Sequence, residues 1–249
     1  MKKIFTLIFG LIIFISSFCQ TWEFPDTIKG EIILKHMFYT ISYNPHYKIP
    51  NYSLYILTTH EVKSDTVDRV NCFAVDPLLD RRKATEPSEY NNTKYDRGHM
   101  APAEDMSFSL ISMTQCFYMS NMCPQLPGLN RGIWKSLENY VREIALQYDS
   151  ICVITGPIIT SDMGIIGNGV AVPTKFFKVI YIYRLHTAIA FCFDNAKYNI
   201  PKNTHTNVLM QQYQMTVQDV ETISGLKFFR GLPANKIIEV KTNKKLNLD

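Results

Sequence analysis

The chain has 249 residues, of which 46% are hydrophobic and 19% are charged. It contains no repeat, no low-complexity tract and no proline- or serine-rich linker, which favours one domain with a sizeable core. Lysine and arginine outnumber aspartate and glutamate by 26 to 22, a formal net charge of +4. Because this excess is small, bulk charge alone does not indicate a nucleic-acid partner.

The N-terminus has the pattern of a secretory signal peptide. Met1-Lys2-Lys3 precedes an apolar run at 4–15, and Ser17 and Cys19 occupy the small-residue positions of the cleavage pattern. The run is shorter than the roughly 20 apolar residues that span a bilayer. We therefore expect cleavage before Gln20, a secreted or periplasmic location and no stable membrane association afterwards. A lipid anchor on Cys19 is disfavoured because a bulky residue precedes the cysteine.

Cleavage leaves residues 20–249 as a single domain. Loss of Lys2 and Lys3 lowers the net charge from +4 to +2, so contact with a polyanion has to come from local clusters. One candidate is Arg81-Arg82-Lys83. The other is a C-terminal set of six: Lys227, Arg230, Lys236, Lys241, Lys244 and Lys245. Solvated surface charge explains the first cluster equally well and the second cluster better.

Five cysteines remain after cleavage: Cys72, Cys116, Cys123, Cys152 and Cys192. The odd number leaves at least one thiol of an exported chain unpaired. Cys152 and Cys192 lie within apolar runs, so we expect both in the core.

The first half of the chain favours strands and loops. Residues 37–60 are rich in aromatic side chains, and 54–57 is predicted as a strand. Phe73-Ala74-Val75 is predicted as a short strand that ends at Asp76-Pro77, since proline cannot donate to a ladder. The polar stretch 80–95 is predicted as a loop.

Residues 131–147 form the clearest predicted helix. Their apolar side chains recur on one stripe at the helical period: Ile133, Leu137, Tyr140, Val141 and Ile144. Upstream, 101–105 predicts a short helical or irregular segment, and 117–122 predicts a strand or an extended loop.

The second half is rich in β-structure. Three β-rich runs follow at 151–155, 176–183 and 188–193, and 216–226 resembles a last short helix. Strands, a central helix and further strands without βαβ alternation predict an α+β fold.

The most informative motif is Asp96-Arg97-Gly98-His99. A histidine, with an unperturbed pKa of about 6.5, can exchange a proton near neutral pH. Arg97 presents a fork of donors that suits phosphate oxygens. Gly98 permits backbone angles closed to other residues, so we expect it to aim the imidazole out of a strand end. Alone, the motif is equally consistent with a histidine of the core or surface.

Asn121, Asn130 and Glu138 are candidates for supporting a metal ion. An amide oxygen is a hard ligand of the kind that Mg²⁺ accepts together with waters and phosphates. Asn130 also suits the N-cap of the main helix, and Asn121 also suits a turn. Glu138 lies about 12 Å along the helix from Asn130, which favours a water-bridged role. Its alternative is a solvated surface carboxylate.

The stretch Tyr95-Asp96-Arg97-Gly98-His99-Met100-Ala101-Pro102 resembles the signature of the DNA/RNA non-specific endonucleases, the family of secreted bacterial nucleases and mitochondrial endonuclease G. Further blocks follow in the order of that family and close to its spacing, at 117–125, 129–138, 155–157 and 170–179. Several ordered blocks make this resemblance much more specific than the first motif alone.

The resemblance implies a ββα-metal, or His-Me finger, core with a central, mainly antiparallel sheet flanked by helices. It implies His99 as the general base and Asn130 as the direct magnesium ligand. Arg97, Asn121 and Glu138 are implied to support the phosphate, the base and the metal-bound waters.

The implied activity is Mg²⁺-dependent hydrolysis of DNA and RNA to 5′-phosphate products, with Mn²⁺ as a substitute metal. DNA and RNA are the implied partners, bound through their phosphates. Whether the protein forms a homodimer is left open by the sequence. The family also uses an upstream arginine, for which Arg69 is the best match and Arg81 or Arg82 the alternatives. Asp96 is expected to orient its neighbours.

Other functions stay open on the residues alone. A zinc module of His99, Cys116 and Cys123 is disfavoured, because the gap between the cysteines is too long for a structural zinc site. A catalytically silent nucleic-acid-binding protein would have no use for an intact set of His99, Asn130 and Glu138. A phosphatase or phosphodiesterase acting on small esters would use similar groups.

Overall fold

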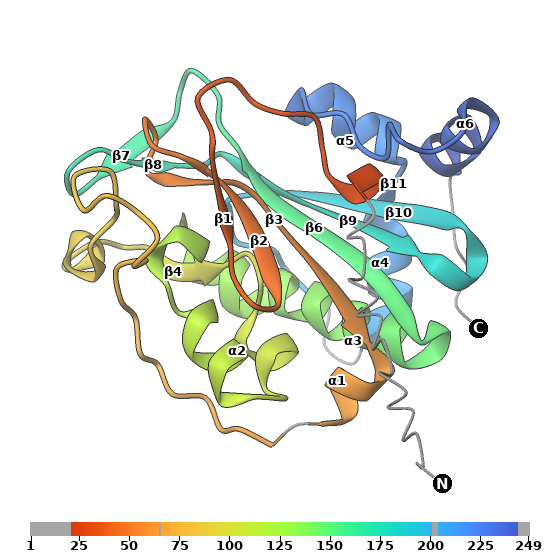
Figure 1. Ribbon diagram of the computed structural model, residues 1–249, viewed down its shortest axis with the longest axis horizontal. Coiled ribbons are helices and arrows are strands. Elements are labelled where there is room, and N and C mark those ends of the chain that lie inside the picture. The colour runs from red at the N-terminus through yellow and green to blue at the C-terminus, as the bar shows by residue number, and fades with distance from the viewer. Residues whose placement is uncertain (1–20, 65, 201–203, 244–249) are drawn as a thin grey trace, which may run out of the picture.

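The computed structural model describes residues 21–64, 66–200 and 204–243, so the predicted signal peptide lies outside the described residues. The centre is an antiparallel seven-stranded sheet (Figure 1). In spatial order its strands are β1 (Ile32–Lys35), β2 (Tyr39–Asn44), β3 (Ile49–Thr58), β6 (Ser150–Ile158), β9 (Lys175–Ile182), β10 (Thr187–Asp194) and β11 (Gln214–Met215). The strands predicted at 176–183 and 188–193 are confirmed to within one residue at each end. Those predicted at 54–57 and 151–155 are confirmed within the longer strands β3 and β6.

The sheet is buried on both faces because alternate residues of its central strands point to opposite sides. Val153 and Ile180 belong to one hydrophobic core, whereas their neighbours Ile154 and Val179 belong to a second. The strands therefore read as nearly continuous apolar runs rather than as an alternating pattern.

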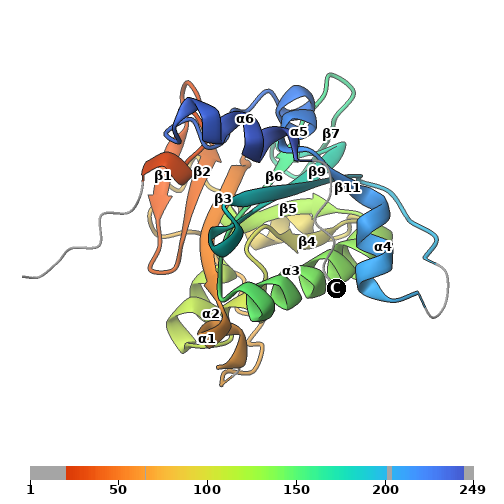
Figure 2. The same ribbon diagram turned by 90° about the vertical axis from the view of Figure 1, so that its right-hand side faces the viewer.

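Helix α3 (Lys135–Tyr148) crosses one face of the sheet (Figure 2). Its predicted apolar stripe is confirmed, with Leu137, Val141 and Ile144 fully buried. The start differs from the prediction, because Leu129–Trp134 forms a π-helical turn with non-helical backbone angles at Gly132. Three further helices lie on this side: α1 (Thr59–Lys63), α2 (Leu110–Cys116) and α4 (Thr206–Tyr213).

Helices α5 (Val217–Ser224) and α6 (Ala234–Thr242) cover the opposite face (Figure 2). Val217, Val220 and Val240 pack there into the second core. The helix predicted at 216–226 is confirmed as α5, which begins with a capping box at Thr216 and ends at Gly225, whose φ is +75°.

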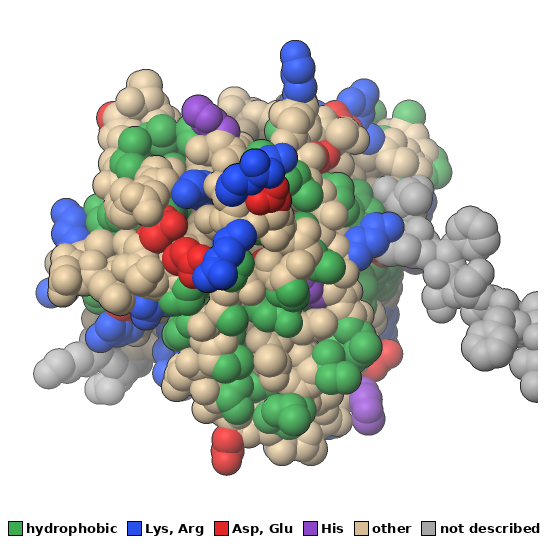
Figure 3. All heavy atoms as spheres, turned by 60° about the vertical axis from the view of Figure 1, so that its left-hand side comes forward, with side chains coloured by type: hydrophobic (Ala, Val, Ile, Leu, Met, Phe, Trp, Pro, Cys, Tyr) green, Lys and Arg blue, Asp and Glu red, His purple; other side chains and the backbone are tan. Residues whose placement is uncertain are grey.

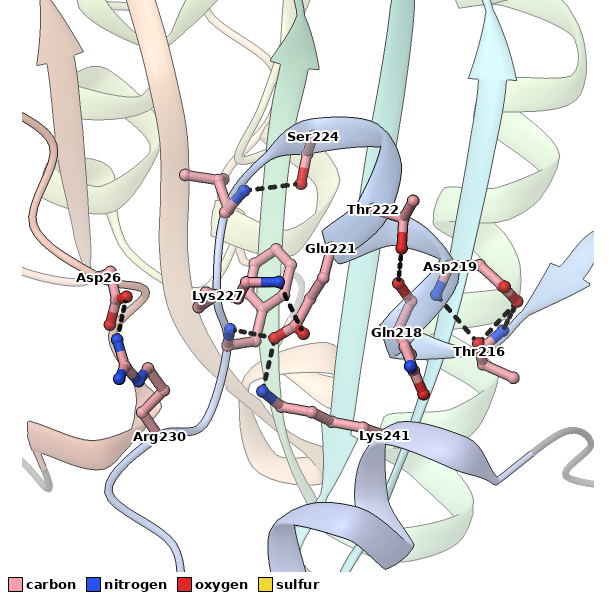
Figure 4. Close-up of polar contacts among 12 residues, drawn as sticks. Asp26, Thr216, Gln218, Asp219, Glu221, Thr222, Ser224, Lys227, Arg230 and Lys241 are labelled. Carbon is pink, nitrogen blue, oxygen red and sulfur yellow. Dashed lines mark hydrogen bonds and ion pairs between the residues drawn. The ribbon is translucent and has the colours of Figure 1, made fainter.

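Buried and surface ion pairs hold this second face together (Figure 4). The Glu221 carboxylate accepts from Lys241 Nζ at 2.7 Å, lies 3.7 Å from Lys227 Nζ, and accepts from the Phe228 backbone N–H at 2.7 Å. Arg230 pairs with an aspartate of the N-terminal segment. Three members of the C-terminal basic cluster are thus engaged within the protein, which favours the structural reading of that cluster.

Two small hairpins lie beside the main sheet. β4 (Asp96–His99) pairs with β5 (Met122–Gln125), and β7 (Gly164–Ile166) pairs with β8 (Val170–Val172). The strand predicted at 73–75 is reduced to one isolated parallel bridge between Ala74 and Tyr118.

The prediction of an α+β fold is confirmed. Residues 119–121 form a short 3-10 helix before β5, and 103–106 form another in the segment predicted as helical or irregular. Cys72, Cys116, Cys123 and Cys192 are free thiols. The expected core position is confirmed for Cys152, which is fully buried, whereas Cys192 is only partly buried. Among the described helices, none is long and apolar enough to cross a membrane.

Candidate active site

His99 ends strand β4, where the hairpin delivers it to a cavity in front of α3. Gly98 pairs with Cys123 on β5. A Cβ atom on Gly98 would lie 2.0 Å from the Oε1 atom of Gln125, whereas no positive φ occurs at this glycine. The sequence-based reason for Gly98 was therefore wrong. The glycine is required by the close approach of Gln125, not by unusual backbone angles.

The His99 imidazole packs against two aromatic rings that also contact each other. The rings of Phe73 and Phe117 lie 5.9 and 4.9 Å from it, centroid to centroid, and only 7% of the residue is exposed. Burial, with a contribution from the Arg69 charge, lowers the pKa of His99 to about 3. The ring is therefore neutral at physiological pH, the form that can accept a proton. Its Nε2 atom has no hydrogen-bond partner among the described residues.

A cavity of about 340 Å³ brings most of the predicted site together. Its walls carry five of the six site residues expected from the sequence: Arg69, Arg97, His99, Asn130 and Glu138. These residues come from separate parts of the chain, and the sheet, the β4–β5 hairpin and α3 hold them in place.

Asn130 is oriented by a neighbour from β4. Its Nδ2 atom donates to Asp96 Oδ2 at 2.9 Å, and Arg131 Nε donates to the same oxygen at 2.8 Å. Although burial opposes it, these hydrogen bonds and the Arg131 charge hold the pKa of Asp96 below its ordinary value. Because the amide nitrogen is committed, the amide oxygen of Asn130 remains as an acceptor. Asn130 lies inside the π-helical turn and Gly128 precedes that turn, so the N-cap alternative is not realised.

Glu138 lies on the first turn of α3 and is 9% exposed. Burial raises its pKa, and the charge of Lys178 opposes that rise. Lys178 itself is fully buried, donates to Thr155 Oγ1 at 2.7 Å and lies 5.2 Å from the centre of the Trp134 ring. Burial lowers the pKa of Lys178 in turn. Glu138 is therefore not the solvated helix carboxylate of the alternative interpretation.

Among the upstream arginines, Arg69 lines the cavity. Its guanidinium lies 5.0 Å from the centre of the Phe117 ring. Arg81 and Arg82 are not among the residues that line it, and they pair with Glu86 and an aspartate instead. The geometry therefore favours Arg69 over its two alternatives.

Arg97 also lines the cavity. Its guanidinium lies over Phe73 and Tyr90, with distances of 5.1 and 5.7 Å to the ring centres, and donates to the Pro87 carbonyl at 2.9 Å. Figure 3 shows one face of the molecule, on which acidic side chains lie beside basic ones, so this face is not uniformly basic.

Asn121 does not join the cavity. It is fully buried, and its amide donates to the carbonyls of Ala101 and Cys116 while accepting from the Ala101 N–H. Two of the three contacts hold the backbone at Ala101, just after His99, and the third holds the end of α2 at Cys116. Direct support of the base by Asn121 is thus not what the geometry provides, because its hydrogen-bonding groups are already used.

The donors at the cavity fit a hard divalent cation. Asn130, Glu104 and Glu138 line this cavity and carry an amide oxygen and two carboxylates. Oxygen donors of this kind bind Mg²⁺ in preference to softer metal ions. Within the described residues no group of three His, Cys, Asp or Glu side chains could hold a metal. A cation here would depend on water and substrate oxygens, as Mg²⁺ commonly does.

Sequence reasoning missed three residues of the cavity. Arg131 and Lys135 add positive charge, and Glu104 adds a carboxylate. Arg131 follows Asn130 directly, so its position in the chain was a usable signal. The sequence did not predict the irregular turn before α3. It therefore did not predict that Lys135 would line the same cavity as Glu138.

Comparison with known families agrees with this geometry. The chain matches the DNA/RNA non-specific endonuclease family over residues 22–235. The protein belongs to this family. It is therefore a hydrolase that acts on phosphodiester bonds, and the family indicates a divalent metal.

Individual relatives cover most of the chain. Nuclease C1 of Cunninghamella echinulata var. echinulata is 31% identical over 229 residues, which are 86% of this chain and 89% of the relative. The mitochondrial nuclease of Saccharomyces cerevisiae is 31% identical over 78% of this chain, which spans only 64% of that relative. A solved structure of EndoG in complex with EndoGI superposes with a TM-score of 0.75 at 30% identity, over 90% of this chain and 94% of EndoG.

These relatives contradict the expected secreted or periplasmic location. The yeast relative is a mitochondrial nuclease, and so are further matched nucleases from mouse and human. Their mitochondrial names overturn that expectation. It rested on a charged start, an apolar run and a cleavage pattern, all in a segment that lies outside the described residues.

Proposed function

We propose that the protein is a magnesium-dependent endonuclease that cuts DNA and RNA without sequence preference. One observation carries the proposal: a neutral, buried histidine shares a cavity with an oriented amide oxygen and two arginines. A histidine of the core or surface would have no reason to meet these three groups together.

His99 acts as the general base in this proposal. Its neutral ring takes a proton from a water molecule, which attacks phosphorus in line with the departing 3′ oxygen. The walls of Phe73 and Phe117 keep bulk water away from the ring, so the imidazole stays uncharged until it receives that proton. The products carry 5′-phosphate and 3′-hydroxyl ends.

Arg69 and Arg97 bind the phosphate from two sides of the cavity. Arg97 is held over Phe73 and Tyr90, which fixes its fork of donors before substrate arrives. Contacts of this kind read phosphates rather than bases, so they favour activity without sequence preference.

Asn130 would hold the metal in this proposal, and Asp96 orients Asn130 through the 2.9 Å hydrogen bond. Glu138 would accept hydrogen bonds from waters bound to the cation. A bound Mg²⁺, or Mn²⁺ as a substitute, would supply positive charge to the phosphate and its leaving oxygen.

Digestion of plasmid DNA and of RNA by the purified full chain tests the proposal. We expect cleavage of both with Mg²⁺ or Mn²⁺ and none after chelation. Asn130→Ala should raise the Mg²⁺ concentration needed for half-maximal activity about ten- to a hundredfold. The control Asn235→Ala, at an exposed position of α6, should not. Equal cleavage with and without chelator, or hydrolysis of small phosphate esters only, would overturn the proposal.

A further inference from the structure

A second cavity adjoins the catalytic cavity. It has a volume of about 500 Å³ and shares Arg69, Ala103 and Glu104 with the catalytic cavity. We call it the side cavity. A volume of this size is typical of sites for small ligands. Its remaining walls come from α1, α2, α3 and the segment after α1.

The side cavity has an apolar surface. Val62, Val67, Met113 and Leu146 contribute to its lining. Leu146 is 44% exposed, although an exposed helix position normally carries a polar side chain. Apolar side chains in an open cavity are suited to the flat face of an aromatic ring.

Apart from the shared Arg69, the charges of the side cavity are mainly those of carboxylates. Asp68, Glu104 and Glu143 line it, and none of the three forms an ion pair among the described residues. Arg142 does not compensate them fully, because its guanidinium already pairs at 2.8 Å with the buried carboxylate of Asp105. Free carboxylates repel a phosphate but accept hydrogen bonds from amino groups and ring N–H groups.

A third cavity, of about 380 Å³, shares Arg69, Arg97, Asn130 and Arg131 with the catalytic cavity. Its lining has three arginines and one carboxylate, that of Asp96. Arginine guanidinium groups bind phosphate oxygens. The catalytic cavity therefore adjoins one cavity suited to the phosphate backbone and another suited to a base.

We propose that the side cavity is a subsite for one unpaired nucleobase, next to the phosphate that is cut. This inference rests on the nuclease function proposed above. Its apolar walls contact the face of the base, and its carboxylates accept from the amino groups of adenine, cytosine or guanine. A nucleobase in a duplex has to leave its stack to enter, which costs a few kcal/mol. The subsite thus favours single-stranded over duplex substrates.

The test measures kcat/KM on a single-stranded oligonucleotide and on a duplex of the same sequence. Leu146→Asp places a charge on the apolar wall without removing a core contact. We expect the single-strand to duplex ratio of kcat/KM to fall about tenfold, since one base contact is worth about that factor or more. The control Leu110→Asp changes a residue of α2 that is 61% exposed and lines none of these cavities, so it should leave the ratio as in the wild type.

A second variant covers the case in which Leu146→Asp lowers the stability of the protein. Glu143→Gln keeps the shape of the side chain and removes its charge. We expect it to weaken cleavage of oligo-dA and oligo-dC more than cleavage of oligo-dT, because thymine has no amino group.

The two proposals fail in different ways. If the wild-type protein cuts neither strand type, the nuclease function is wrong. If it cuts both and the two variants keep wild-type ratios for strand type and base, the protein is a nuclease and the base subsite is wrong.

Discussion

The two faces of the sheet each bury a glutamate near lysine, but the two glutamates are satisfied differently. On the α5–α6 face, Glu221 accepts from Lys241 and from the Phe228 N–H, both at 2.7 Å. On the α3 face, Glu138 forms no hydrogen bond or ion pair within the described residues, and its pKa is raised by burial. Glu221 and Glu138 are buried to a similar extent, 5% and 9% exposed, but only Glu221 has its carboxylate paired within the protein.

Whether a buried carboxylate has partners within the protein distinguishes a structural charge from a candidate functional one. A buried carboxylate normally finds partners, because leaving it unpaired is costly. Glu221 follows that rule and joins α5 to α6 (Figure 4). Glu138 departs from it at the wall of a cavity, where water, metal or substrate can supply the missing partners.

The largest expected effect on the α3 face comes from the base. His99→Ala should lower kcat by about 10² to 10⁴, the usual contribution of a general base. Binding of an oligonucleotide to the variant, followed by fluorescence anisotropy, should remain close to wild type, since the arginines are unchanged. A variant with near-normal turnover would show that another group activates the water.

The paired variants Glu138→Gln and Glu221→Gln examine the comparison directly. Glu138→Gln should lower kcat/KM about ten- to a hundredfold with little change in the free energy of unfolding. Glu221→Gln should leave kcat/KM unchanged and lower the free energy of unfolding by about 3 kcal/mol, because Lys241 loses a partner in a mostly buried site. Urea unfolding and cleavage assays on both proteins measure the two effects. The reverse pattern would mean that the roles of the glutamates are exchanged.

The smallest expected effect is a change in pH dependence. A raised pKa means that Glu138 gains its charge only above the ordinary carboxyl range. If the ionised form supports catalysis, kcat/KM should rise about tenfold per pH unit below that pKa. His99, with a pKa of about 3, adds no limb above pH 4. Glu138→Gln should flatten the profile, and an unchanged slope in the variant would exclude Glu138 as its source.

Much of the fold was predictable from local patterns. The apolar stripe is confirmed in α3 from Leu137 to Ile144, whereas its first member, Ile133, lies in the π-helical turn before α3. The long apolar runs are confirmed as β6, β9 and β10. The prediction of a strand at 73–75 was wrong, because these residues do not form a β-ladder. Its backbone meets a partner only at Ala74, because strand pairing depends on what lies alongside rather than on composition.

The residues that line the site were less predictable from the sequence than the helices and strands of the fold. The motif and its following blocks indicated His99, Asn130 and Glu138, and these three line one cavity. Asn121 appeared equally suited to the site, yet its amide is used entirely in holding backbone. The local sequence does not show whether an asparagine amide lines a cavity, as that of Asn130 does, or bonds to neighbouring backbone, as that of Asn121 does.

The sequence by itself determined the residue types available for phosphodiester chemistry, their order, and the helix and strands that carry them, because these depend on local period and motif. Only the tertiary structure decided which of those groups meet and in what state. Gly98 is required by Gln125, Asn130 is turned by Asp96, and burial changes the pKa of His99 and Glu138. The reason is physical: packing, hydrogen-bond partners and desolvation are set by residues that are far apart in the chain and adjacent in space.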